Sequence, residues 1–183
     1  MPEITKGTVW NFPFDTTLST LFDGFENTVI DSTLWTETTD DEVATKEAGT
    51  VGNFATGSNR LTVTVFNATL SRYWQIESVG LPDAAVAIAV TGIGGVSSSA
   101  TVTYSFGNDT DGWTDVGWAI DTGETRSGTI LLLPTGDQTY AIYGPGGESA
   151  KVSKPNGAQL KIRVDTGANV SLVLKLDECR YAF

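Results

Sequence analysis

Alternation of apolar and polar residues with a period of two recurs through most of this chain. It occurs in six segments, at 60–66, 72–78, 100–106, 139–143, 159–165 and 170–176. Successive side chains of a strand point to opposite sides of a sheet, so this period indicates strands with one buried face. Stretches such as GNDTDG and PTGD, which favour tight turns, separate the segments. We therefore predict an all-β fold, an antiparallel β-sandwich.

Three segments give local expectations. The segment 159–176, QLKIRVDTGANVSLVLKL, predicts a β-hairpin. The segment 91–100, TGIGGVSSSA, predicts a flexible loop from its Gly and Ser content. In 15–25, DTTLSTLFDGF, apolar residues recur at helical spacing after Asp15, but the threonines and Gly24 disfavour a helix. A short helix and an irregular turn both stay open there.

Size and charge limit the partners. The 183 residues suit one domain, and the longest apolar run, at 84–90, is far shorter than a membrane span of ~20 residues. The start MPEITKGTVW has no apolar core of the kind a secretory signal needs. A net charge of −11 argues against nucleic acid as a partner, because phosphate binding needs clustered Lys and Arg.

The first 20 residues differ from the rest and form a predicted unit of their own, followed by a sandwich domain at 21–183. Trp10, Phe12 and Phe14 alternate in VWNFPF, so a strand would turn all three rings to one face. Either the segment is an edge strand whose rings complete the core, or it is an arm that docks its rings into a neighbouring subunit.

The segment 21–35, LFDGFENTVIDSTLW, resembles the opening of the concanavalin-like group of lectins and glucanases. The resemblance implies a jelly-roll β-sandwich. Glucanases of this group carry their carboxylates on one strand as Glu-x-Asp-x-x-Glu, and neither this pattern nor its variant with one spacer removed occurs in the chain. The acidic runs at 40–47 and 109–115 have other spacings.

Other catalytic devices are also missing from the sequence. Histidine is absent, which excludes Ser-His-Asp and Cys-His arrangements. The single cysteine, Cys179, follows Asp177 and Glu178, whose charges disfavour a thiolate, so we expect a buried structural thiol. We therefore expect a protein that is not an enzyme and needs no cofactor.

The segment 107–117, GNDTDGWTDVG, offers a candidate calcium site. Asp109, Asp111 and Asp115 carry the hard oxygen atoms that calcium prefers. The segment departs from the EF-hand pattern, because Gly107 stands at its first position and no Glu closes the loop. Asp and Gly also build turns without any metal, so a metal-free hairpin turn is the alternative.

Aromatic residues near the expected loops are candidates for sugar binding, because flat rings stack on pyranose faces. The candidates are Trp113, Trp118, Tyr140 and Tyr143, with Tyr73 and Trp74 in a similar setting. Aromatic residues in alternating strands usually pack in the core, and the sequence does not separate the two roles.

A lectin-like sandwich without a catalytic pair or disulfides resembles virion proteins of tailed bacteriophages, in particular capsid decoration (cement) proteins and fibre heads. The resemblance implies a structural protein, assembled in the host cytoplasm, that binds a preformed capsid and associates with itself as a dimer or trimer. Its contacts would come from Trp10, Phe12 and Phe14. The alternatives are a carbohydrate-binding receptor or adhesin module and, third, a diverged hydrolase.

Overall fold

The computed structural model describes residues 19–25, 30–39, 44–50, 59–67, 72–95, 100–136, 138–145, 147, 149–154, 156–167 and 170–182. These residues form strands joined by turns, and no helix occurs among them, which confirms the predicted all-β class. The strands are β1 (Thr20–Asp23), β2 (Trp35–Thr39), β3 (Ala44–Thr50), β4 (Asn59–Asn67), β5 (Arg72–Ser78), β6 (Ala85–Gly94), β7 (Ala100–Asn108), β8 (Gly112–Ile120), β9 (Thr125–Gly136), β10 (Thr139–Tyr143), β11 (Ser149–Ser153), β12 (Gln159–Thr166) and β13 (Val170–Ala182).

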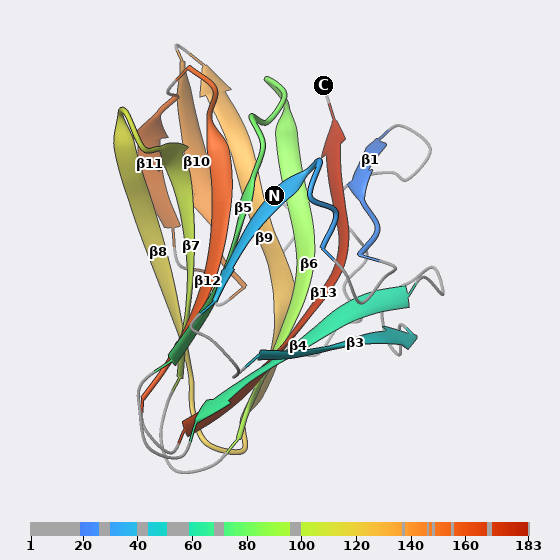
Figure 1. Cartoon of the computed structure of the whole chain (residues 1–183). Coiled ribbons are helices and arrows are strands. Elements are labelled where there is room, and N and C mark those ends of the chain that lie inside the picture. Colours follow the sequence, from blue (N-terminus) through green and yellow to red (C-terminus); the bar gives the residue numbers. More distant parts are fainter. Residues whose placement is uncertain are drawn as a thin grey trace.

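The strands form two antiparallel sheets that pack as a jelly-roll β-sandwich (Figure 1). The large sheet has the order β11-β10-β9-β6-β13-β4-β3, and β1 adds to it by pairing with β13. The small sheet has the order β2-β5-β12-β7-β8. All six segments in which the sequence alternates are strands, so the predicted antiparallel sandwich is confirmed.

The core lies between the sheets and is built from the apolar halves of the alternating segments. In β12 the inward residues are Leu160, Ile162 and Val164, each fully buried, and β13 contributes a matching leucine set at every second position from 172 to 176. Burying a side chain of this size contributes about 1.5–3 kcal/mol to folding. The largest buried side chains are those of Trp35, Trp74, Trp118, Tyr104 and Phe106.

The predicted hairpin at 159–176 is wrong, because its two strands belong to different sheets. β12 pairs with β5 and β7 in the small sheet, whereas β13 pairs with β4, β6 and β1 in the large one. The chain therefore passes from the small sheet to the large one between Thr166 and Val170. The alternation in the sequence shows only that each strand has one buried face. Two strands that face each other across the sandwich meet this condition as well as two neighbouring strands of one sheet do.

The helix alternative for 15–25 is also wrong within the described residues. Residues 20–23 form β1, whose pairing with β13 gives their backbone groups partners that a helix would have supplied internally. The chain then turns at Phe25, which has a φ of 48° and whose N–H donates to Asp23 Oδ1 at 2.8 Å. Helical spacing of four apolar residues is too weak a preference to resist sheet pairing.

The loop predicted at 91–100 is shorter than expected, because residues 91–94 extend β6 and residue 100 begins β7. Residues 96–99 lie outside the described part. Gly94 is needed for close packing rather than for flexibility, since a Cβ there would lie 2.0 Å from the carbonyl oxygen of Asp121. At this position the glycine therefore marks a close approach of two backbone segments and not a flexible loop.

Residues 1–18 lie outside the described part of the chain, and with them the predicted contact residues Trp10, Phe12 and Phe14. The division into an arm at 1–20 and a sandwich at 21–183 stays a prediction, although Thr20 already belongs to β1. Within the described ranges, no helix is long and apolar enough to cross a membrane.

Candidate functional site

The candidate calcium segment, 107–117, spans the end of β7, the turn that follows it and the first part of β8. Asn108 organises it: its Oδ1 accepts hydrogen bonds from the N–H groups of Thr110 and Asp111, and its Nδ2 donates to Asp111 Oδ2 and to the carbonyl of Asn156. Asp109 Oδ1 instead accepts a hydrogen bond from Trp113 Nε1 at 3.0 Å.

The three aspartates therefore do not converge on one point. Asp109 and Asp111 serve the turn, and Asp115 lies further along β8, opposite Ser105. Across the described ranges, no group of three or more acidic or cysteine side chains is arranged to hold a metal ion. This arrangement favours the hairpin turn for the segment, and the calcium site stays a prediction.

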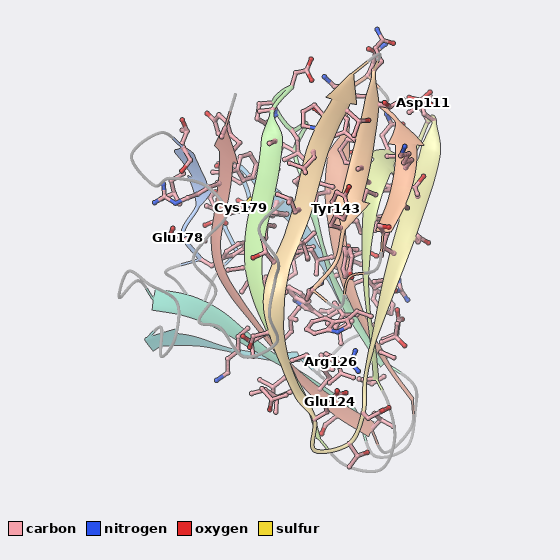
Figure 2. The ribbon with its side chains drawn as sticks, turned by 180° about the vertical axis from the view of Figure 1, so that it is seen from behind. Asp111, Glu124, Arg126, Tyr143, Glu178 and Cys179 are labelled. Carbon is pink, nitrogen blue, oxygen red and sulfur yellow. The ribbon has the colours of Figure 1, made fainter. Side chains whose placement is uncertain are left out.

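Two of the four predicted sugar-binding rings are core residues. Trp118 is 1% exposed and Tyr140 is 3% exposed, so neither presents a face to a ligand. Tyr140 packs on Phe106, with ring centroids 4.9 Å apart. Tyr143 is exposed on the large sheet, as Figure 2 shows from that side, and Trp113 is half-buried on the small sheet.

The outward face of the small sheet gathers polar side chains and two rings, and we call it the polar face. Its residues alternate with the buried ones along β5, β12, β7 and β8. They are Tyr73, Gln75, Glu77, Gln159, Lys161, Arg163, Asp165, Thr101, Thr103, Trp113, Asp115, Gly117 and Ala119.

One corner of the polar face is built around Arg163. Its guanidinium lies 4.0 Å from the centroid of the Tyr73 ring, and it donates hydrogen bonds of 2.7–3.0 Å to both carboxylate oxygens of Asp165. A longer contact of 3.4 Å joins its Nη1 to Gln75 Oε1. Two-pronged binding to a carboxylate fixes the plane of the guanidinium, so the ring and the cation form one ordered unit.

A second ring–cation pair forms the opposite corner. Lys161 Nζ lies 3.6 Å from the centroid of the Trp113 ring and 3.7 Å from Glu77 Oε2. The indole N–H of Trp113 is held by Asp109, which fixes the ring from the turn. Each corner therefore combines an aromatic ring, a cation and a carboxylate.

The strand register gives the separation of the two corners. Tyr73 pairs with Asp165, whereas Trp113 pairs with Gly107, which pairs with Gln159. The backbone positions of Tyr73 and Trp113 thus lie about 20 Å apart along the strands and about 14 Å apart across them, from the usual strand dimensions. The two corners are closer than this, because the cations Arg163 and Lys161 that contact the rings are only two residues apart on β12. Gly117 and Ala119 on β8 provide a low, exposed strip on the same face. They lie level with Arg163 and Asp165, and β7 separates them from β12.

The sequence contained a signal for the polar face that aromatic residues alone did not provide. In RYWQIES and QLKIRVD the outward positions are occupied by long side chains with several hydrogen-bonding groups, such as Gln75, Lys161 and Arg163. A strand that only needs a solvated face can use Thr or Ser there, as β7 does at Thr101 and Thr103.

No protein-family model matches the chain, and no curated protein matches it. Solved structures resemble it in fold. An exo-beta-agarase has a TM-score of 0.52 and 12% identity over 87% of this chain, and a sialidase has 0.50 and 10% over 94%. The chain spans 24% and 19% of those two proteins. The carbohydrate-binding module TmCBM61, solved with beta-1,4-galactotriose, has a TM-score of 0.49 and 12% identity over 85% of this chain and 91% of its own. At these identities the likeness shows the β-sandwich fold alone.

Proposed function

We propose that this protein is a non-catalytic carbohydrate-binding β-sandwich that binds an extended glycan on its polar face. The observation that carries the proposal is the pair of ring–cation corners on that one face, Tyr73 with Arg163 and Trp113 with Lys161. The fold likeness to an exo-beta-agarase and a sialidase, both names of carbohydrate-active enzymes, agrees with this class of ligand.

The chemistry of the polar face suits a sugar chain. A pyranose presents an apolar face of C–H groups and a rim of hydroxyls, so it needs rings to pack against and groups that both donate and accept hydrogen bonds. Tyr73 and Trp113 supply the rings. Gln75, Lys161 and Asp165 supply the donors and acceptors between and beside them.

The spacing of the corners favours an oligosaccharide over a single sugar. A ligand that packs against both rings must span at least the side chains of Lys161 and Arg163, whose backbone positions on β12 lie about 7 Å apart. The contacts among the side chains hold them in place before any ligand arrives, which reduces the entropy lost on binding.

Affinity electrophoresis through gels containing neutral and acidic polysaccharides tests the proposal. We expect at least one polysaccharide to retard the protein, and Trp113→Ala or Tyr73→Ala to weaken that retardation about tenfold or more, which corresponds to about 1.4 kcal/mol. Tyr143→Ala, which removes an exposed ring from the large sheet, is the matched control and should change nothing.

Gly117→Tyr gives a test that removes no existing contact. A Cβ at Gly117 meets no atom within 4 Å, so the variant should fold, yet its ring would stand on the low strip of the polar face. We expect it to block binding while its melting temperature stays near that of the wild type. Retardation that survives this change, or that Tyr143→Ala abolishes equally, would place the glycan elsewhere.

The finer prediction from the sequence, a capsid decoration protein of a virion that assembles as a dimer or trimer, stays a prediction. Its contact residues Trp10, Phe12 and Phe14 lie outside the described part of the chain. A glycan-binding sandwich is compatible with a role in a virion, since attachment to a host surface is one use of such a module.

A further inference from the structure

A second candidate site lies at one end of the sandwich and is formed by residues that do not belong to the polar face. It is a hollow of about 330 Å³ between the β9–β10 turn, the residues that precede β6 and those that follow β11. The residues that matter for its chemistry are Asp83, Pro134, Gln138, Tyr140, Lys154 and Asn156.

Asp83 is held in place at the hollow by two hydrogen bonds to the same oxygen. Its Oδ1 accepts from the Tyr140 hydroxyl at 2.9 Å and lies 2.7 Å from Lys154 Nζ. The hydrogen bond from Lys154, followed by that from Tyr140, lowers the pKa of the Asp83 carboxyl, so it stays ionised. Oδ2 accepts no hydrogen bond from the described residues, and the Asp83 side chain is 74% exposed.

Two amides line the hollow in defined positions. Gln138 has a φ of 58°, and its carbonyl accepts a hydrogen bond from the N–H of Lys154 at 2.6 Å. The carbonyl of Asn156 accepts from Asn108 Nδ2 at 2.9 Å. Their backbones are thus tied down, while neither side-chain amide is hydrogen-bonded to the part of the chain that the structure describes.

The charges of the hollow limit what it can take. Asp83 repels an anionic ligand and Lys154 repels a cationic one. The two charges, 2.7 Å apart, also neutralise each other. What remains for a ligand is a set of acceptors and donors, Asp83 Oδ2 and the amides of Gln138 and Asn156, with the Pro134 ring as an apolar wall. This combination matches a neutral ring that carries neighbouring hydroxyls.

We infer that this hollow binds a single terminal sugar ring through its vicinal hydroxyls. The inference rests on the proposed function for its ligand class, a carbohydrate, but it uses different residues. Its volume is at the lower end for small-molecule sites, as a single ring requires.

The hollow and the polar face meet at the β7–β8 turn. Asn108 in this turn binds the Asn156 carbonyl at the hollow, and Asp109 in the same turn binds the Trp113 indole on the polar face. Asp111 of this turn lies at one end of the sandwich in Figure 2. The arrangement lets one glycan lie on the face and place its end in the hollow.

Titration of ¹⁵N-labelled protein with the methyl glycosides of glucose, galactose and mannose tests the inference. We expect at least one of them to shift the amide signals of Gly136, Thr139, Lys154 and Asn156. Gln138→Gly, which keeps the positive φ and removes the side-chain amide, and Asn156→Ala should each weaken this binding about fivefold or more. Lys151→Ala, an exposed change on β11, is the control.

The outcomes separate this inference from the proposed function. Trp113→Ala should leave monosaccharide binding intact while it reduces retardation by polysaccharide. The inference is overturned if no glycoside shifts the four amides, or if Gln138→Gly and Asn156→Ala leave the affinity within twofold. If retardation by polysaccharide still depends on Trp113 in that case, the proposed function stands and only the inference about the hollow is wrong. The two amide variants leave the Asp83–Tyr140 contact in place, so weaker binding in them cannot come from the loss of that contact.

Discussion

Trp35 and Asp23 join the two sheets: the indole N–H of Trp35 on β2 donates to Asp23 Oδ2 on β1 at 2.7 Å. Trp35 is 1% exposed and packs against Phe22 and Phe25, with ring centroids 5.7 and 5.5 Å away. The hydrogen bond is therefore the means by which a buried indole N–H is satisfied where the small sheet meets the large one.

Asp23→Ala should lower the free energy of unfolding by about 1–3 kcal/mol, because it leaves this buried donor without an acceptor. Asp23→Asn keeps an oxygen that can accept, so it should cost less. Urea unfolding followed by Trp fluorescence measures both. Equal losses in the two variants would mean that the charge of Asp23, and not the hydrogen bond, is what stabilises the fold.

Two buried tryptophans allow a matched comparison. Trp74 Nε1 donates to Glu37 Oε1 at 2.6 Å, whereas Trp118 Nε1 is buried without a hydrogen-bond partner among the described residues. Trp118→Phe removes an unsatisfied donor, which offsets part of the lost packing, so it should cost at least about 1 kcal/mol less than Trp74→Phe. The same urea experiment ranks them, and the reverse order would show that Trp118 has a partner.

The Cys179 thiol should be inert in the folded protein. Burial, and after it the charge of Asp23, raises the pKa of this thiol well above its ordinary value, and the side chain is fully buried on β13. We expect a maleimide to label it only as fast as the chain unfolds, with a rate that rises with urea. Rapid labelling in buffer would show that this part of β13 opens locally.

The stability of the fold should decrease at alkaline pH because Tyr140 ionises there. Burial, with the hydrogen bond to Asp83 second, raises the pKa of Tyr140 from 10.0 to about 12. The unfolded chain therefore loses this proton first, so the contribution is complete below pH 10 and declines from pH 10 towards 12. The melting temperature of Tyr140→Phe should decline less over this interval than that of the wild type. An equal decline of the melting temperature in the two proteins would show that Tyr140 is not the group responsible.

The positions of strands were readable from the sequence because a half-buried strand imposes its period directly. Whether an aromatic ring points into the core or outward was harder to predict. Trp113 and Trp118 are five residues apart on one strand, so they must face opposite sides, and only one of them can lie on an outward face. The same holds for Tyr140 and Tyr143 on β10. Which member faces outward depends on the opposite sheet, as does the assignment of β12 and β13 to different sheets, and neither is a local property.

The crossing of the chain between β12 and β13 has a consequence for biosynthesis. β12 is the middle strand of the small sheet, and β13 lies between β6 and β4 in the large one. A ribosome delivers these two strands last among the thirteen, after the strands that flank them. Until then β5 and β7 lack the strand that joins them, as do β6 and β4. The nascent chain must therefore keep unpaired strand edges and apolar faces from aggregating until β12 and β13 have been made, and both sheets close together at that stage.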